Sequence, residues 1–193
     1  MQTDIYSILS KVNIGNVEVQ VASIDELRGS SDPRNAETMY FTAQTGMKLK
    51  FVKIILNEKK NYQMNKFFYK QIGKDHFWRD RLIWTDKQWL KYSSNPLLDT
   101  WILKDNKDDL IGYYEIEKHE NKEFELINMG ILSDYRSKGY GSLLLTHVLK
   151  NSSDNNAKKV WVHTCSLDHK FALANYISRG FKVFKKEQID FVA

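Results

Sequence analysis

The chain has 193 residues, of which 42% are hydrophobic and 27% charged, with only 2 prolines and 9 glycines. A chain of this length is expected to fold around one hydrophobic core. The composition excludes collagen-like, low-complexity and mostly disordered proteins. Lysine and arginine exceed aspartate and glutamate by 29 − 24 = 5, and the basic residues are scattered along the chain. This distribution slightly favours a small anionic ligand and argues against nucleic acid as a partner.

The sequence contains no sign of a membrane span or an export signal. No apolar run approaches about 20 residues, and residues 1–10 lack both a basic start and a long apolar stretch. Cys165 is the single cysteine, so neither an internal disulfide nor a zinc-finger spacing can occur. We therefore expect a cytoplasmic protein that makes no membrane contact.

Residues 1–40 lack sustained periodicity and contain the turn formers Gly29–Pro33, so we predict an N-terminal extension or lid there. Residues 41–193 are predicted to form one domain. It is expected to begin with a strand at Lys50–Leu56 and a helix with Met64, Phe67, Phe68 and Ile72 on one stripe. Three strands follow at Trp101–Lys104, Leu110–Glu117 and Phe124–Leu132, and then a helix through Leu144, Leu145, Val148 and Leu149. The last expected elements are a strand at Lys159–Thr164, a helix at Phe171–Ser178, and two closing strands at Phe181–Phe184 and Gln188–Val192. Short links between the middle strands indicate an antiparallel meander in a layered α/β domain.

The segment Asp75–Tyr92 is rich in aromatic residues. Its rings, which belong to His76, Phe77, Trp78, Trp84 and Trp89, could wall a pocket or pack against a sheet. Its acidic side chains, Asp75, Asp80 and Asp86, could meet a cationic amine or lie solvated on a helix.

The stretch Ile131–Leu145 carries the clearest chemical signal, because a strand leads into a loop with Gly139 and Gly141 that opens a helix. Free amides at a helix start bind anions, and these glycines let a phosphate approach without a Cβ clash. Arg136 and Lys138 add positive charge, so a pyrophosphate is the natural ligand. A Walker A loop is absent, and the dinucleotide fingerprint lacks its third glycine. A tight turn without a ligand is the alternative interpretation.

The hexapeptide R-S-K-G-Y-G at Arg136–Gly141 resembles the [RQ]-x-x-G-x-[GA] loop of the GNAT superfamily of acyl-CoA-dependent N-acyltransferases. Ile131 stands five residues upstream, where that family usually ends its fourth strand on an aliphatic residue. The likeness implies a single GNAT-like domain with a central mixed, mostly antiparallel sheet flanked by helices. It also implies acetyl-CoA as the acetyl donor.

A second stretch, A-L-A-N-Y-I-S-R-G-F at Ala172–Phe181, is similar to the family's A-x-x-x-Y-x-x-x-G-F helix. Asp168 can cap the start of this helix, and Gly180 can end it in a left-handed conformation. The adjoining V-W-V-H-T-C-S-L-D-H, Val160–His169, resembles a bacterial subgroup with W-V-H-T-C-T-L-D-H. The resemblance covers roughly residues 50–192 and leaves the first forty outside it.

The resemblance implies that the pyrophosphate of acetyl-CoA binds the loop amides and that its pantetheine arm pairs with the backbone of Ile131 and Ser133. The residues that it assigns to coenzyme binding are Ile131, Leu132, Ser133, Arg136, Ser137, Lys138, Gly139, Tyr140, Gly141, Ser142, His169 and Tyr176. Two positions depart from the family pattern. His169 stands where many relatives have Asn, which puts one coenzyme contact in question, and Ser133 stands where many have Pro.

Acetylation of an amine needs a deprotonated nitrogen, so a general base is expected. Glu125 matches the glutamate base of relatives that acetylate protein lysines. Strand alternation predicts that it shares a face with Ile127, Met129 and Ile131. The alternative is a simple strand-edge charge.

Tyr176 matches the family tyrosine that protonates the CoA thiolate, with a structural buried tyrosine as the alternative. His163 is a reserve base on the same strand face as Cys165, which is expected to pack as a small apolar residue. A nucleophilic Cys165 would indicate a covalent acyl-enzyme, whereas the family usually transfers directly in a ternary complex. His163, Cys165 and His169 would form only an incomplete zinc site, so no metal is expected.

The resemblance therefore predicts an acetyl-CoA-dependent N-acetyltransferase that acts on a primary amine of an unidentified small molecule or peptide. A non-catalytic acyl-CoA-binding or regulatory module, in which the base is lost, is the alternative. A nucleic-acid binder is a third interpretation, suggested only by the positive charge and the aromatic residues. A homodimer is compatible with the sequence.

Overall fold

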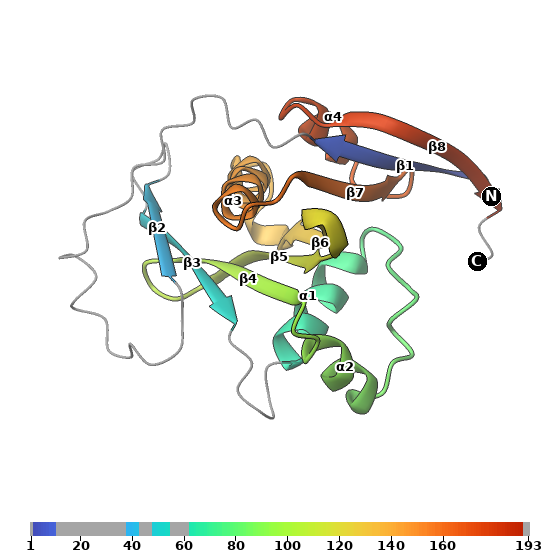
Figure 1. The fold of residues 1–193 in the computed structure, drawn as a ribbon. Coiled ribbons are helices and arrows are strands. Elements are labelled where there is room, and N and C mark those ends of the chain that lie inside the picture. The colour runs from blue at the N-terminus through green and yellow to red at the C-terminus, as the bar shows by residue number, and fades with distance from the viewer. Residues whose placement is uncertain (1, 11–37, 43–47, 55–61, 191–193) are drawn as a thin grey trace.

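The computed structural model describes residues 2–10, 38–42, 48–54 and 62–190. Its elements are β1 (Gln2–Ser10), β2 (Thr38–Thr42), β3 (Lys48–Ile54), α1 (Tyr62–Gly73), α2 (Asp86–Ser93), β4 (Leu98–Asp105), β5 (Leu110–Lys118), β6 (Glu123–Ile131), α3 (Tyr140–Asp154), β7 (Lys159–Cys165), α4 (Ala172–Ile177) and β8 (Lys182–Asp190), as Figure 1 shows. The strands and helices expected from Lys50 onward are present in the expected order. Two differences are the additional helix α2 and a single strand in place of the two closing ones.

One sheet of eight strands joins these elements, in the order β2-β3-β4-β5-β6-β7-β1-β8. All the described strand pairs are antiparallel except β6 and β7, which run parallel. The predicted mixed, mostly antiparallel sheet flanked by helices is therefore confirmed.

The start of the chain belongs to this sheet. Residues 2–10, which we expected to lie in an extension or lid, form β1 between β7 and β8, with Ile5 opposite both Cys165 and Glu187. Residues 11–37, most of the expected extension, lie outside the described residues. The strand was missed because its paired residues come 150 or more positions later in the chain, and local patterns do not show such pairings.

The prediction of two closing strands, Phe181–Phe184 and Gln188–Val192, was wrong. The structure has one continuous strand, β8, over Lys182–Asp190, and residues 191–193 lie outside the described part. The charged residues between these two segments do not interrupt the strand, because β8 is at the edge of the sheet and Lys182–Lys186 are exposed. Charged side chains are common on such edge strands.

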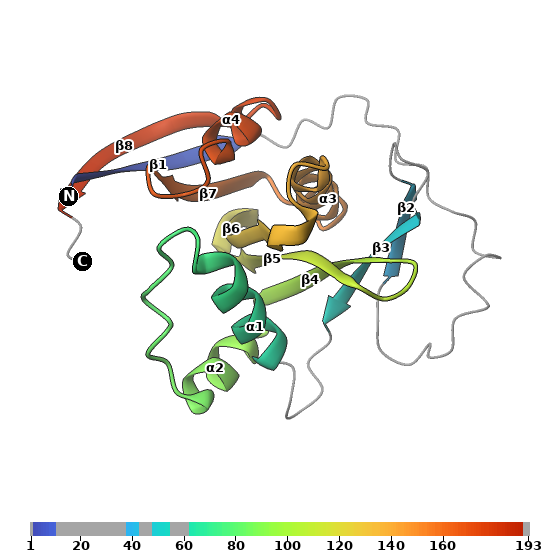
Figure 2. The ribbon, with the colours of Figure 1, turned by 180° about the vertical axis from the view of Figure 1, so that it is seen from behind.

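Helices cover both faces of the sheet: α3 and α4 lie on one face, and α1 and α2 on the other (Figures 1 and 2). Neighbouring residues of one strand accordingly enter different cores. Tyr114 packs in the α3 cluster with Leu144 and Val148, whereas Tyr113 packs with Phe68 and Ile72 of α1. This alternation is what a sheet buried on both faces requires.

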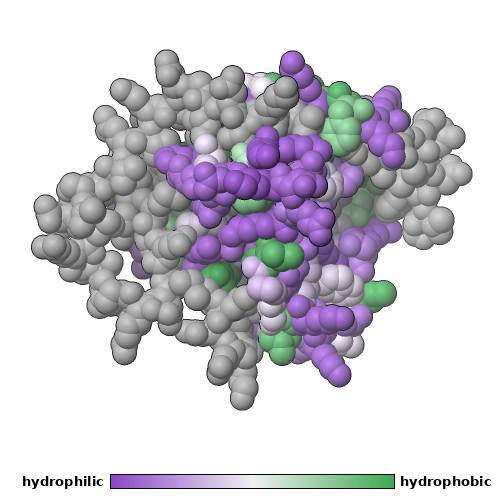
Figure 3. All heavy atoms as spheres, viewed as in Figure 1, coloured by the Kyte–Doolittle hydropathy of each residue, from purple (hydrophilic) through white to green (hydrophobic). Residues whose placement is uncertain are grey.

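On the face seen in Figure 3, hydrophilic residues predominate and the hydrophobic ones are scattered. Large apolar side chains that remain exposed include Ile83 and Phe171, on different parts of the chain. None of the described helices is long and apolar enough to cross a membrane.

β6 and β7 are paired only over Glu123–Leu126 and Lys159–Val162. The register between β5 and β6 shifts so that Ile127 has no opposite residue, which is a β-bulge. A bulge bends its strand, and the outer half of β6 is left without a β7 partner among the described residues. The two strands thus diverge in the middle of the sheet.

A buried polar network supports the bulged strand from the α1 side. Glu115 of β5 is 1% exposed and accepts hydrogen bonds from Asn65 Nδ2 at 2.5 Å, Asn128 Nδ2 at 2.6 Å and the Tyr92 hydroxyl at 2.8 Å. Arg81 Nη1 lies 3.7 Å from the same carboxylate. Because Asn128 follows the bulge, this network fixes the diverging half of β6.

We expect Glu115→Ala to lower the free energy of unfolding by about 3–5 kcal/mol, because it leaves the buried Asn65, two partly buried donors and the Arg81 charge without this acceptor. Urea unfolding measures the change. Glu117→Ala, two residues along β5 at a partly exposed position, is the matched control and should cost at most about 1 kcal/mol. Equal losses for the two variants would show that the network contributes no stability of its own.

Candidate active site

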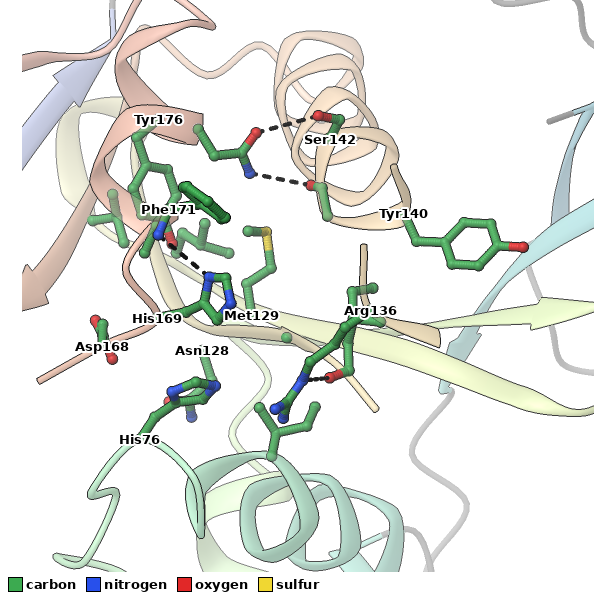
Figure 4. Close-up of a pocket in the computed structure, with 18 of the residues that line it drawn as sticks. His76, Asn128, Met129, Arg136, Tyr140, Ser142, Asp168, His169, Phe171 and Tyr176 are labelled. Carbon is green, nitrogen blue, oxygen red and sulfur yellow. Dashed lines mark hydrogen bonds between the residues drawn. The ribbon is translucent and has the colours of Figure 1, made fainter. Parts of the chain in front are cut away.

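A cavity of about 460 Å³ lies where β6 and β7 diverge (Figure 4). The outer half of β6, the loop that starts α3, the segment leading into α4, and residues near the end of α1 form its walls. Of the residues expected to bind coenzyme, Ile131, Arg136, Ser137, Gly139, Tyr140, Gly141, Ser142, His169 and Tyr176 line it, whereas Leu132, Ser133 and Lys138 do not.

The loop before α3 presents a row of free amides. Within the described part of the chain, no group accepts a hydrogen bond from the N–H groups of residues 137–141, and the first paired amides are those of Ser142 and Leu143, both bonded to the Gly139 carbonyl. Ser137 and Gly139 have positive φ angles of 61° and 81°, which make the backbone turn sharply. Such a concave backbone at a helix N-terminus is suited to an anion.

The two loop glycines leave space in front of these amides. A Cβ added at Gly139 would meet no described atom within 4 Å, and one at Gly141 would come no closer than 3.9 Å to Asn175 Nδ2. The side chain of Tyr140, between them, is buried in the α3 core and points away from the other labelled residues (Figure 4). Both glycines line the cavity, so the open space beside them leaves room for a phosphate group in front of these amides.

The two loop cations point in different directions. Arg136 donates from Nε to the Ile131 carbonyl at 3.1 Å and from Nη1 to Asp75 at 2.8 Å, while its buried Nη2 meets no hydrogen-bond partner in the described ranges. Lys138 instead donates to the Asp134 carbonyl at 2.8 Å. Arg136 is thus paired with Asp75 at the cavity wall and keeps one donor that could bind an anion.

The outer half of β6 offers a free edge. Leu132 N donates to the Ile111 carbonyl of β5 at 2.9 Å, so by alternation the N–H and C=O of Ile131 point to the opposite, open side. The Ile131 carbonyl already accepts from Arg136, but its N–H faces the cavity side. Ser133 belongs to a short turn outside the lining, so the geometry supports a pairing role for Ile131 and not for Ser133.

Tyr176 projects from α4 toward the cavity and is 6% exposed (Figure 4). Its ring packs against Phe181, with the centroids 5.6 Å apart. Burial, together with the negative charge of Asp168, raises the pKa of the Tyr176 hydroxyl above its usual value. The hydroxyl is therefore protonated at neutral pH and can donate a proton or a hydrogen bond.

Asn175 is a site residue that sequence reasoning missed. It lines the cavity and joins α4 to the glycine loop, donating to the Gly141 carbonyl and accepting from the Ser142 hydroxyl, both at 3.4 Å. His169, at the position where many relatives have Asn, accepts from the Phe171 amide through Nδ1 at 3.3 Å. The A-x-x-x-Y pattern places Asn175 one residue before Tyr176, but it gives no signal for this bond.

Asp168 has another role than the predicted helix cap. The N-cap of α4 is Phe171, and Asp168 instead accepts from the Thr164 hydroxyl at 2.7 Å and from Trp78 Nε1 at 3.3 Å. It thereby holds the end of β7 against the segment after α1. The expectation that aromatic residues of Asp75–Tyr92 wall a pocket is met by His76 and Trp78, which line the cavity.

Glu125 does not lie on the face that strand alternation predicted. The bulge at Ile127 reverses the alternation, so Met129 and Ile131 pack on the same core side as Leu126, and Glu125 faces the other way. Its carboxylate lies 3.0 Å from His119 Nε2 and 3.3 Å from His163 Nδ1. Of Glu125 and His163, only His163 lines the cavity.

Cys165 lies at the end of β7, outside the cavity lining. Burial and the charge of Asp168 raise the pKa of its thiol, which disfavours the thiolate that a nucleophile needs. No group of three or more His, Cys, Asp or Glu side chains suited to a metal occurs in the described ranges.

Residues 60–181, well over half of the chain, match the model of the acetyltransferase (GNAT) family. The chain belongs to this family. A curated relative, the mycothiol acetyltransferase of Corynebacterium efficiens, is 28% identical over 82 residues, which make up 42% of this chain. Those residues span only 27% of that enzyme's length.

Solved structures agree on the GNAT fold. A GCN5-related N-acetyltransferase from Sphaerobacter thermophilus has a TM-score of 0.59 at 12% identity, with 95% of this chain and 49% of that chain covered. An aminoglycoside acetyltransferase from an uncultured soil sample has a TM-score of 0.56 at 13% identity, covering 75% and 94%. At these identities the likeness concerns the fold alone.

Proposed function

We propose that the protein transfers an acetyl group from acetyl-CoA to a primary amine. The observation that carries this proposal is the row of free amides at residues 137–141, which lies in one cavity with the open β6 edge and Tyr176. An anionic pyrophosphate fits the amides and Arg136 Nη2, and an amide-bearing arm fits the Ile131 N–H. The thioester would then lie near Tyr176, where β6 and β7 diverge.

The described residues favour direct transfer within a ternary complex. Cys165 is outside the cavity lining and its raised pKa disfavours a thiolate, so no described cysteine is placed to form an acyl-enzyme. The attacking amine would enter beside His163 and Trp78, opposite the glycine loop. Tyr176 would donate its proton to the departing sulfur. A non-catalytic acyl-CoA-binding module is less well supported, because Glu125 and His163, which could serve as bases, are present where β6 and β7 diverge.

Incubation of the purified protein with acetyl-CoA and a panel of amines tests the proposal. Amino acids, polyamines, aminoglycosides and lysine peptides cover the classes of small and peptide acceptors, and release of the CoA thiol reports transfer. Acetyl transfer to at least one amine supports the enzyme. Tight calorimetric binding of acetyl-CoA without turnover of any amine would favour the binding module instead.

Arg136→Met should raise the Kd for acetyl-CoA about tenfold to 100-fold, the range expected for losing a charge-assisted hydrogen bond. Lys138→Met removes an equal charge from the same loop, but that side chain bonds back to Asp134 and does not line the cavity. The Kd of Lys138→Met for acetyl-CoA should change less than threefold. Calorimetric titration of both variants decides whether position or total charge matters, and equal losses would contradict the assignment of Arg136.

A further inference from the structure

The side chains of His119, Glu125, Trp161 and His163 form a cluster where β6 and β7 begin to diverge. Glu125 lies opposite Trp161 in the parallel pairing, and Leu126 opposite Val162 is the last pair. His163 is therefore the first residue of β7 beyond that pairing. His163 therefore lines the cavity at the point where the two strands separate.

The geometry points to a relay in which His163 accepts the proton of the attacking amine and Glu125 positions the imidazole. This inference rests on the proposed acetyl transfer. His163 lines the cavity and its side chain is 52% exposed, whereas the Glu125 side chain is 17% exposed and lies outside the lining. The exposed imidazole of His163 can reach a substrate, and the Glu125 carboxylate can orient that imidazole from outside the cavity.

The carboxylate determines which nitrogen of His163 carries the proton. An ionised carboxylate only accepts hydrogen bonds, so the contact of 3.3 Å from Glu125 Oε1 to His163 Nδ1 requires a proton on Nδ1. In the neutral ring, the lone pair then resides on Nε2, at the far side of the imidazole. A base needs such a lone pair directed at the substrate.

Two further contacts fix the relay. Glu125 Oε2 lies 3.0 Å from His119 Nε2, so both carboxylate oxygens have an imidazole partner. The Trp161 ring stands edge-on to His163, with centroids 5.0 Å apart and planes at 82°. The other charged pair on these strands, Lys159 with Glu123 at 3.1 Å, neutralises itself. The Glu125 carboxylate is then the charge that stabilises a protonated His163.

The proton balance of the step is complete. The amine nitrogen forms a bond to the acetyl carbonyl carbon and gives one proton to His163 Nε2, while the C–S bond breaks. The sulfur leaves with the bonding electrons and takes a proton from Tyr176. Solvent then carries the proton from His163 back to Tyr176, so the products are an amide and the free thiol.

His163→Ala should lower kcat about 10²-fold to 10⁴-fold, the range for loss of a general base, with the acetyl-CoA Kd within threefold of wild type. The assay uses acetyl-CoA and the panel amine that the wild type acetylates fastest. Added imidazole should raise the kcat of His163→Ala at least tenfold.

Glu125→Gln should lower kcat about tenfold to 10³-fold in the wild-type background, but less than threefold in the His163→Ala background, since a positioning residue acts only through its partner. His119→Gln, which touches the same carboxylate from outside the cavity, is the matched control and should lower kcat less than tenfold. Circular dichroism and melting temperature verify that each variant is folded.

The outcomes separate the relay from the proposed function. If the wild type acetylates an amine while folded His163→Ala keeps a third of its kcat, the relay is wrong and acetyl transfer stands. The relay is also wrong if formate rescues Glu125→Ala and imidazole fails to rescue His163→Ala, because Glu125 would then be the direct base. If the wild type acetylates no amine, the proposed function itself fails.

Discussion

Gly141→Val should raise the Kd for acetyl-CoA at least about 100-fold, so that calorimetric titration detects no binding at micromolar concentrations. The valine side chain would enter the open space where a phosphate would contact the loop amides, since the nearest described atom to a Cβ there is 3.9 Å away. Gly141 lies inside α3, where valine has at least the helix propensity of glycine. The fold should therefore be retained.

Gly139→Val is expected to abolish acetyl-CoA binding as well, for two combined reasons. Its side chain would fill the space of a phosphate, and its backbone would be strained. At φ 81° a β-branched residue is strained regardless of any ligand. Gly180→Val is the control for this strain, because Gly180 has φ 84° and does not line the cavity, and an added Cβ would meet no described atom within 4 Å. Gly180→Val should lose stability and keep acetyl-CoA affinity. Unchanged affinity in a folded Gly141→Val protein would remove the phosphate assignment of the loop.

The elements that form locally could be predicted from sequence. The strands β3 to β7 and the helices α1, α3 and α4 follow from hydrophobic patterns within each segment, and the loop at Arg136–Gly141 follows from glycine spacing. Gly180 was expected in a left-handed conformation and has φ 84°. In each case the cause lies within a few residues of the effect, which is what a sequence pattern records.

The errors share a different cause, which is dependence on residues far away in the chain. β1 pairs with strands at the other end of the chain, and the bulge at Ile127 arises from its register with β5. That one extra residue moved Glu125 to the opposite face from the prediction, because side chains alternate with a period of two. The bonds of Asn175 to the glycine loop, like those of Asp168 to Trp78, likewise span more than 30 residues. Local periodicity contains none of this information.

Tyr176→Phe should lower kcat about tenfold to 10³-fold while the KM for acetyl-CoA stays within a few-fold of wild type, as expected for loss of a general acid. The change removes one hydroxyl and keeps the ring that packs against Phe181. Burial and Asp168 raise the pKa of this hydroxyl, so it is a poor acid in the resting site. It becomes useful when negative charge develops on the sulfur, because a proton or hydrogen bond is then needed at that place.

Tyr113→Phe is the matched control for removing a buried hydroxyl. Tyr113 is fully buried on the α1 side of β5, its hydroxyl has no hydrogen-bond partner among the residues that the structure describes, and it does not line the cavity. Its kcat should equal that of the wild type, and both variants should melt within a few degrees of it. Steady-state kinetics with saturating amine distinguishes the outcomes. Full kcat in Tyr176→Phe would mean that Tyr176 serves packing alone and that water protonates the leaving sulfur, because the relay commits His163 to the amine.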